Sequence, residues 1–378
     1  MRDIVILGST GSIGVQALEV IAANPTKFRV VGLSAGSNNL ERLAEQVKKF
    51  SVPIVGTTGD ASILKGLLPN VEVIDGPDSS RQIAALSCDV VLNGITGSIG
   101  LGPTLAALEV GNKVALANKE SLVAGGDLVM AHGRDRIIPV DSEHSALFQA
   151  MSAGKLSDVE KVILTASGGP FRDRDDLSSV TVADALNHPT WSMGPVVTIN
   201  SATLVNKGLE IIEAHYLFGV PYSKIEAVIH PQSVVHSMVE FKDGSTIAQA
   251  SPPNMKGPIS YAIAYPDRVA HAAAAIDWKS SHTWTFQPVD NERFPAVDLA
   301  KRCGALGGSV AAMYNAANEV AVAAFMENQI PFTAIVEVIE KTVTKLGAQA
   351  RSVVRDLADV SAIEKDARRV AHEALGKK

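Results

Sequence analysis

The sequence predicts an α/β protein with an N-terminal doubly wound parallel sheet, a central α+β region and a C-terminal helical bundle. Three observations favour this fold class. Short apolar runs alternate with helical patterns at the start, polar clusters and a hairpin pattern fill the middle, and apolar residues recur with a helical period of about 3.6 toward the end. The expected divisions are an N-terminal domain over 1–140, a central domain over 141–270, a linker over 271–290 and a helical domain over 291–378.

Seven apolar runs predict the strands of the N-terminal sheet. In chain order they are Asp3–Leu7, Arg29–Ala35, Val52–Val55, Val71–Ile74, Asp89–Leu92, Lys113–Ala117 and Arg136–Val140. In the central region, "VVHSMVEF" and "STIAQAS" flank Asp243-Gly244, a pair typical of a tight hairpin turn. The segments "SVAAMYNAANEVAVAAFMEN", "FTAIVEVIEKTVTKLG" and "DVSAIEKDARRVAHEAL" predict the C-terminal helices.

The composition excludes several classes of function. The chain has 378 residues, is 46% hydrophobic and 20% charged, and carries a net charge of -6. It has no basic tract, so we expect neither nucleic acid nor an anionic membrane as a partner. With only Cys88 and Cys303, neither a disulfide framework nor a cysteine metal site is expected. Without a signal peptide or an apolar run of about 18 residues, a cytoplasmic location is expected.

The stretch "GSTGSIG" at Gly8–Gly14 follows the first expected strand and precedes a helix. Glycines there let the backbone approach a pyrophosphate, and the helix N-terminus offers free N–H groups. The pattern therefore indicates a Rossmann-like nucleotide site, and the alternative is a tight strand–helix turn without a ligand.

The end of the second expected strand, "LSAGSNN" at Leu33–Asn39, favours NADP(H) over NAD(H). NAD-binding sheets usually place a carboxylate here for the ribose hydroxyl, but none occurs before Glu41. Ser37 and Asn38 can instead donate hydrogen bonds to a 2′-phosphate. Arg42 is either a further partner of that phosphate or a solvated helix charge.

A second heptad, "GITGSIG" at Gly94–Gly100, repeats the glycine spacing of the first. Since its strand is expected beside the first strand, both heptads should face one crevice. The second heptad is either a closely packed turn or a ligand contact, and a second independent nucleotide site is not expected. It is followed by "KVALANKESL", which places Asn118, Lys119 and Glu120 at the carboxyl end of a strand.

Carboxylates and small polar residues gather after Val140. Asp141 and Glu143 are two apart in what we expect to be an extended segment, where both could face one Mg²⁺ or Mn²⁺ ion; the alternative is a solvated pair. The segment "INSATLVNKGLEIIEAH" predicts one helix with Ser201 near its start. On it Asn206, Lys207 and Glu210 form either a phosphate cradle with a spare carboxylate or an exposed salt bridge.

Two glycine- or proline-bounded segments complete the candidate site. "TASGGPF" places Ser167 before two glycines, as a phosphate-binding loop or a plain turn. "HPTWSMG", with Trp191 and Met193, is either a lid that excludes water or a loop packed on the core. For His230 and His236 we expect structural roles.

Taken together, "GSTGSIG", "ALANKES", "PVDSEHSA", "TASGGPF", "HPTWSMG", "INSATLVNKGLEIIEAHYLF", "HPQSVVHSMVEF" and "NAANEVAVAAF" resemble the 1-deoxy-D-xylulose 5-phosphate reductoisomerase family. The motifs run in order from residue 4 to about residue 330, and the rest matches only as a helical tail. The resemblance implies a homodimer that converts 1-deoxy-D-xylulose 5-phosphate to 2-C-methyl-D-erythritol 4-phosphate. It also implies NADPH and a divalent cation, Mg²⁺ or Mn²⁺ with Co²⁺ as a further candidate.

The resemblance assigns roles residue by residue. The implied metal ligands are Asp141, Glu143 and Glu210, and the implied catalytic residues are Lys119, Glu143 and His188. The implied cofactor-binding residues are Thr10, Gly11, Ser12, Ile13, Gly36, Ser37, Asn38, Asn118, Glu120 and Gly194. The implied substrate-binding residues are Lys119, Ser142, Glu143, Ser167, His188, Trp191, Ser201, Asn206, Lys207 and Glu210.

One position departs from the family pattern. The family often carries Lys after the glycine in "AG-x-N", where this chain has Ser37. We therefore expect NADPH preference to persist with weaker discrimination. Two rival functions are another NADP-dependent dehydrogenase of a phosphorylated, semialdehyde or homoserine-type substrate, and a non-catalytic NADPH-sensing protein. An ordinary dehydrogenase would not explain the three carboxylates of Asp141, Glu143 and Glu210.

Overall fold

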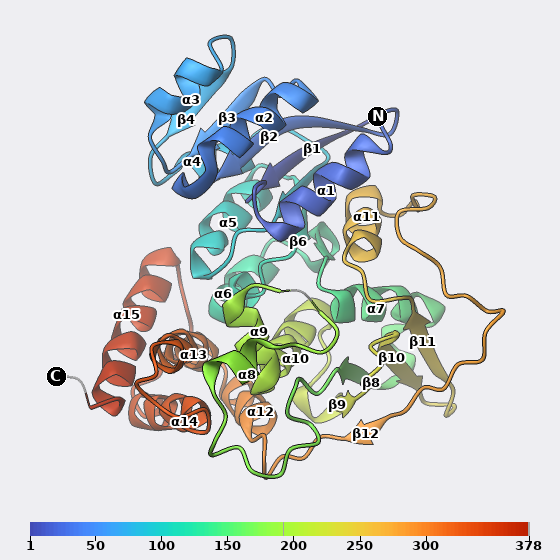
Figure 1. Cartoon of the computed structure of the whole chain (residues 1–378), viewed down its shortest axis with the longest axis vertical. Coiled ribbons are helices and arrows are strands. Elements are labelled where there is room, and N and C mark those ends of the chain that lie inside the picture. Colours follow the sequence, from blue (N-terminus) through green and yellow to red (C-terminus); the bar gives the residue numbers. More distant parts are fainter. Residues whose placement is uncertain (192, 377–378) are drawn as a thin grey trace. The chain divides into compact units, whose positions relative to one another are not determined.

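The computed structural model describes residues 1–191 and 193–376, and its contacts group them into two compact units (Figure 1). Ser192 of the expected lid and the last two residues of the expected helical domain lie outside the described residues. The first unit comprises Met1–Ser121, Leu128–Ser145 and Asn254–Ala274, and the second comprises Leu122–Asp127, Ala146–Pro253 and Ala275–Lys378. The four-part division at residues 140, 270 and 290 stays a prediction about domains.

The first unit is built on a seven-stranded parallel sheet, which confirms the predicted doubly wound fold. The strand order is β4-β3-β2-β1-β5-β6-β7. The strands are β1 (Arg2–Leu7), β2 (Phe28–Ala35), β3 (Ile54–Thr57), β4 (Glu72–Asp75), β5 (Val90–Asn93), β6 (Lys113–Leu116) and β7 (Ile137–Pro139). Each predicted strand is present, with ends shifted by at most two residues. β1 and β5 are neighbours although β2, β3 and β4 lie between them in sequence order, so the strand order reverses between β1 and β5.

Helices connect the strands of this sheet. They are α1 (Ser12–Ala22), α2 (Leu40–Phe50), α3 (Ala61–Leu67), α4 (Ser79–Ala84), α5 (Leu101–Glu109) and α6 (Glu120–Met130). Helix α11 (Lys256–Ala264), far along the chain, contacts α1, β6 and β7. The central strands are buried, with Ile4 through Leu7 fully inaccessible, as expected for a parallel sheet covered on both faces.

The second unit contains a five-stranded mixed sheet of order β11-β10-β8-β9-β12. Its strands are β8 (Val159–Ala166), β9 (Ile225–Ile229), β10 (Val235–Phe241), β11 (Thr246–Ala250) and β12 (Gln287–Pro288). β8 and β9 are parallel and the other pairs are antiparallel. The predicted hairpin joins β10 to β11, and Gly244 at its turn has φ +85°, a conformation that favours glycine.

Helices make up the rest of the second unit. They are α8 (Val182–Leu186), α9 (Pro195–Ala202), α10 (Val205–Phe218), α12 (Ala296–Leu306), α13 (Val310–Met326), α14 (Ala334–Gly347) and α15 (Leu357–Ala374). α13 packs against both α14 and α15, which confirms the C-terminal bundle. Helix α7 (Ser142–Ala150) begins in the first unit and ends in the second. None of the helices in the described part of the chain has the length and hydropathy needed to span a membrane.

Candidate active site

The first glycine heptad forms the turn between β1 and α1. Gly8 has φ +73°, and a Cβ added there would lie 2.8 Å from the carbonyl oxygen of Gly94. α1 begins at Ser12, is preceded by Gly11 without a side-chain cap, and has no acidic residue in its first turn. Helix N-terminal N–H groups without a capping side chain are available to an anion, so this turn has the features of a dinucleotide phosphate site.

The segment after β2 is exposed and free of carboxylates. Gly36 precedes a short 3₁₀ turn over Ser37–Asn39, and the side chain of Asn39 caps α2 by accepting from the Arg42 backbone N–H at 3.3 Å. Sequence reasoning missed Gln46, whose buried amide donates to the Ser9 carbonyl at 2.9 Å. This bond ties α2 to the first glycine turn. The only signal in the sequence is a polar residue on the apolar face of a helix.

The second glycine heptad packs against the first. The Gly94 N–H donates to the Leu7 carbonyl at 3.0 Å, and the Gly94 carbonyl occupies the space beside Gly8. A Cβ at Gly100 would lie 2.6 Å from Cγ of Asn118. Of the two interpretations left open by the sequence, the geometry supports a closely packed turn.

Lys119 and Asp141 form an ion pair at the carboxyl ends of β6 and β7. Nζ of Lys119 lies 2.9 Å from Oδ2 of Asp141, and the two side chains are only 15% and 17% exposed. The neighbouring Asn118 is buried, and its amide donates to the Glu120 carboxylate at 2.8 Å. The structure thus places three predicted site residues in one turn and pairs one of them with a predicted metal ligand.

The prediction that Asp141 and Glu143 share an extended segment is wrong. The Ser145 N–H donates to the Asp141 carbonyl at 2.8 Å, and Ser142 is the first residue of α7. Glu143 therefore lies in the first turn of a helix, where the helix dipole stabilises a carboxylate. Its carboxylate accepts a hydrogen bond from the hydroxyl of Ser142. Asp and Ser favour helix starts, and this preference outweighed the strand pattern that precedes them.

In the second unit, three predicted substrate residues converge. Nε2 of His188 lies 3.0 Å from Oγ of Ser167 and 3.1 Å from Oγ of Ser201. Ser167 follows β8, and Gly168 and Gly169 after it have φ +81° and +63°. A Cβ at Gly169 would lie 3.0 Å from the Ser201 carbonyl oxygen, so glycine lets this loop approach the end of α9.

The hydrogen bonds of His188 fix its tautomer. Nδ1 accepts from the backbone N–H groups of Thr190 at 3.1 Å and Trp191 at 2.9 Å. Since Nδ1 is an acceptor, the neutral ring carries its proton on Nε2 and donates it toward the two serines. Burial, with a smaller effect from the Arg172 guanidinium, holds the pKa of His188 below its usual value. Each serine then keeps its own hydroxyl hydrogen for a ligand oxygen.

The predicted single helix around Ser201 is also wrong, because the segment forms two helices. Thr203 donates its hydroxyl to the Ile199 carbonyl at 3.1 Å, and Leu204 has φ +59°, which ends α9 before α10 begins at Val205. Ser201 therefore lies at the end of α9 rather than near a helix start. A helix break at a leucine has no strong signal in the sequence.

Helix α10 carries a polar triad whose charged pair is buried, and the alternative of an exposed salt bridge is wrong. The Glu210 carboxylate accepts hydrogen bonds from the amide of Asn206 and the ammonium of Lys207. Lys207 and Glu210 are 3% and 1% exposed. An ion pair this deeply buried needs close compensation of charge, so the pair itself holds both side chains in place.

The predicted lid lies beside the convergent serines. The Trp191 ring centroid is 6.3 Å from that of His236, and Gly194 precedes α9, whose first residue is Pro195. Nε2 of His236 donates to the Ser251 carbonyl at 3.1 Å. His230 is fully buried, bonds the Thr285 carbonyl and stacks on Phe286. Structural roles for the two histidines agree with these contacts, and lid closure stays a prediction.

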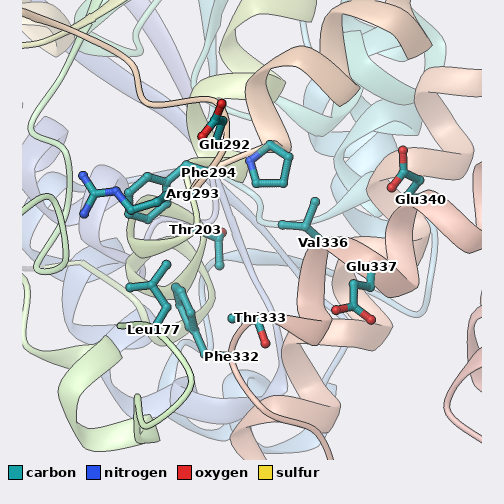
Figure 2. Close-up of a pocket in the computed structure, with 11 residues that line it drawn as sticks. Leu177, Thr203, Glu292, Arg293, Phe294, Phe332, Thr333, Val336, Glu337 and Glu340 are labelled. Atoms are coloured by element: carbon teal, nitrogen blue, oxygen red, sulfur yellow. The ribbon is translucent and has the colours of Figure 1, made fainter. Parts of the chain in front are cut away.

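A separate cavity of about 230 Å³ lies in the second unit and contains none of the predicted site residues (Figure 2). Apolar side chains such as Phe294 and Phe332 line it, together with acidic groups at its rim. Arg293 at its edge donates to the carbonyls of Arg172 and Arg174. The cavity is therefore distinct from the residues described above.

A doubly wound sheet with a glycine turn and an acid-free second strand, joined to a unit with a cluster of serine and histidine side chains, is typical of an NADP-dependent oxidoreductase. Three family models match the chain. They are "1-deoxy-D-xylulose 5-phosphate reductoisomerase" at residues 4–126, its C-terminal domain at 137–218, and "DXP reductoisomerase C-terminal domain" at 250–370. The chain belongs to the 1-deoxy-D-xylulose 5-phosphate reductoisomerase family.

Relatives and solved structures agree along the whole chain. The reductoisomerase of Leifsonia xyli is 55% identical over 100% of this chain and 99% of the relative, and that of Streptomyces coelicolor is 52% identical over 98% and 92%. The Zymomonas mobilis enzyme, solved with NADPH, is 39% identical with a TM-score of 0.92 and covers 99% of both chains. A reductoisomerase solved with NADPH, fosmidomycin and magnesium is 34% identical with a TM-score of 0.92, covering 100% of this chain and 98% of the other.

Proposed function

We propose that this chain isomerises and reduces 1-deoxy-D-xylulose 5-phosphate to 2-C-methyl-D-erythritol 4-phosphate, with NADPH as reductant and a divalent cation as cofactor. The observation that carries the proposal is the family match along the whole chain, with the motif residues standing in the local arrangements described above. Solved relatives that bind NADPH and magnesium support the choice of cofactors.

The donor set fits a hard divalent cation. Asp141, Glu143 and Glu210 offer only oxygen ligands, which suit Mg²⁺ or Mn²⁺. In the structure a lysine accompanies two of these carboxylates, Lys119 with Asp141 and Lys207 with Glu210. A bound cation would polarise the substrate's carbonyl and hydroxyl oxygens as a Lewis acid. We propose these three residues as its ligands.

The cluster of Ser167, His188 and Ser201 is the proposed site of the substrate phosphate, and Asn206 and Lys207 on α10 are proposed as further ligands of that phosphate. The two serine hydroxyls can donate to phosphate oxygens because the imidazole N–H is directed to their oxygen atoms. Holding the phosphate away from the reacting carbons uses binding energy to orient them. Closure of the loop with Trp191 would exclude water.

The first unit is the proposed NADPH site. The glycine turn at Thr10–Ile13 would hold the pyrophosphate, and Gly36, Ser37 and Asn38 would hold the 2′-phosphate. Asn118, Glu120 and Gly194 are proposed to complete the site toward the nicotinamide. Lys119 and Glu143 are the groups proposed to move protons or orient hydroxyls, with Ser142 beside them.

We propose a homodimer in the cytoplasm. β11 is an edge strand of the five-stranded sheet, and its exposed residues include Ile247 at 40%. An unpaired, partly apolar edge is a surface that a second copy could cover. Two thiols without a disulfide are compatible with a reducing compartment. Sedimentation velocity at micromolar concentration tests the assembly, and a monomer would contradict it.

The decisive assay follows NADPH oxidation with 1-deoxy-D-xylulose 5-phosphate, with and without Mg²⁺. Metal-dependent consumption with formation of the branched polyol phosphate is expected. Consumption of other phosphorylated or semialdehyde substrates alone would favour an ordinary dehydrogenase. NADPH binding without turnover of any of these substrates would favour a sensing protein.

A further inference from the structure

A chain of four buried polar side chains runs from β5 to the turn that carries Lys119. Asn93, Thr104 and Ser121 are fully inaccessible, and Asn118 is 1% exposed. Nδ2 of Asn93 lies 2.8 Å from Oγ1 of Thr104, which lies 3.0 Å from Oγ of Ser121. The Ser121 hydroxyl in turn donates to Oδ1 of Asn118. All four residues belong to the first unit.

Backbone groups fix the orientation of both amides. Oδ1 of Asn93 accepts from the Ile95 N–H at 3.1 Å, and its Nδ2 also donates to the Gly100 carbonyl at 2.9 Å. Oδ1 of Asn118 accepts from the Ser121 N–H at 3.0 Å. Since a backbone N–H can only donate and a carbonyl can only accept, neither amide can be flipped.

The hydrogens then run in one direction. The hydroxyl oxygen of Thr104 lies 3.0 Å from both the Gly100 carbonyl oxygen and Oγ of Ser121, so its single hydrogen can go to either. Because Asn93 also donates to the Gly100 carbonyl, the Thr104 hydrogen can go to Ser121, and that of Ser121 to Asn118, without leaving that carbonyl unpaired. In that arrangement every link from Asn93 to Asn118 has its own hydrogen, and hydrogen bonds in such a series polarise one another. If the hydrogen bond between Thr104 and Ser121 were removed, buried polar atoms would be left unpaired.

At its Asn118 end, this series of hydrogen bonds contacts the second glycine heptad and the carboxylate of Glu120. Nδ2 of Asn118 donates to the carbonyls of Ile95 at 2.8 Å and Gly97 at 2.9 Å, and to Glu120 at 2.8 Å. Both ends of its amide are therefore engaged within the protein. Lys119, between Asn118 and Glu120, is the residue paired with Asp141.

We propose that Asn93, Thr104, Ser121 and Asn118 form a positioning relay for the turn at Lys119 and Glu120. The second heptad serves the reaction through the carbonyls of Ile95, Gly97 and Gly100, which anchor the relay. This inference rests on the proposed function, since Lys119 is a proposed catalytic residue. A displaced turn moves Nζ of Lys119 away from the reacting atoms, and about 1 Å of misplacement can cost on the order of a hundredfold in rate.

The test compares Thr104→Val with Thr342→Val in the full-length enzyme. Both changes replace a fully buried threonine hydroxyl, but that of Thr342 bonds only the Val338 carbonyl within α14. In T104V we expect kcat with saturating NADPH and substrate to fall by roughly tenfold, about 1.4 kcal/mol in activation free energy. The KM for NADPH should stay within about twofold, and Thr104→Ser should restore kcat. In T342V we expect only the melting temperature to fall, with kcat unchanged.

Hydrogen exchange supplies a readout that does not depend on turnover. Peptides covering residues 94–101 and 117–122 should exchange faster in T104V than in the wild type, and should be unchanged in T342V. If T104V does not fold, Ser121→Ala breaks the same link and is expected to give the same pattern.

Three outcomes would overturn the relay. These are wild-type kcat in folded T104V or S121A, unchanged exchange in both peptides, or loss of NADPH affinity with kcat intact, which would make the second heptad a cofactor contact. A wild-type enzyme without turnover would instead contradict the proposed function, while the exchange experiment would still decide on the relay.

Discussion

Lys119 and Asp141 form an ion pair of 2.9 Å between the ends of two neighbouring parallel strands. The pair joins a proposed proton-handling residue to a proposed metal ligand. Glu210 in the second unit is likewise held by Lys207. Each carboxylate is thus held in position by a neighbouring lysine.

Replacing Lys119 by Met should lower kcat by at least about a hundredfold, because general acid–base or orienting groups contribute on the order of 10² to 10⁴. Steady-state NADPH oxidation at saturating Mg²⁺ measures the effect. The control is Lys161→Met, which removes a lysine paired with Glu226 and Glu240 on the second unit's sheet. A K119M enzyme as active as K161M would remove Lys119 from the mechanism.

Replacing Glu210 by Gln should abolish metal-dependent turnover and leave NADPH binding intact. It also leaves Lys207 buried without its carboxylate, so the unfolding free energy should fall by about 3 kcal/mol. Fluorescence titration with NADPH and urea unfolding separate the two effects. Retained metal activation, with the magnesium dependence of the wild type, would show that Glu210 is not a ligand.

His188 should make the enzyme less stable in acid. Above the unfolded-state pKa of about 6.5, the imidazole is neutral in both states and has no effect. Because burial lowers the pKa of His188 in the folded protein, acidification between these two pKa values protonates the unfolded chain first and favours unfolding. The loss levels off below the folded-state pKa.

Urea unfolding at pH 7.5 and 5.5 measures this dependence. His188→Asn should lose less unfolding free energy on acidification than the wild type. The exposed His372 offers a matched control, because His372→Gln should keep the wild-type pH dependence. An identical pH dependence in H188N and the wild type would contradict the prediction.

Introducing lysine at position 37 should sharpen cofactor choice. Ser37 lies exposed after Gly36, and no carboxylate precedes Glu41. In Ser37→Lys, one charge-assisted hydrogen bond to the 2′-phosphate, about 1.5 kcal/mol, should raise the NADPH over NADH ratio of kcat/KM by roughly tenfold. Ser37→Ala serves as the control. Comparable kcat/KM values for both cofactors in the wild type would show that the present donors do not select the phosphate.

The sequence predicted the strands, the hairpin and the C-terminal helices because each depends on local periodicity and turn chemistry. The sequence also named the motif residues of the candidate site, and three of them, Ser167, His188 and Ser201, lie together in the structure. Their meeting depends on the positive φ of Gly168 and Gly169, which a pattern of two glycines only suggests.

Other features have no local signal. The break between α9 and α10 depends on the left-handed backbone of Leu204, which no sequence pattern predicts. The relay through Thr104 joins residues on β5, α5 and α6 that become neighbours only in the folded sheet. A threonine in an apolar helix gives no hint of such a partner.

The contact between Gly8 and Gly94 constrains both glycine heptads at once. A side chain at Gly8 would collide with the main chain at position 94, and one at Gly94 would press on Ile13 and on the Leu7 carbonyl. Neither turn can therefore accept a larger residue unless the other moves. The two heptads meet at this one contact, so the size of the residue that can stand at position 8 or at position 94 is limited by the turn opposite it.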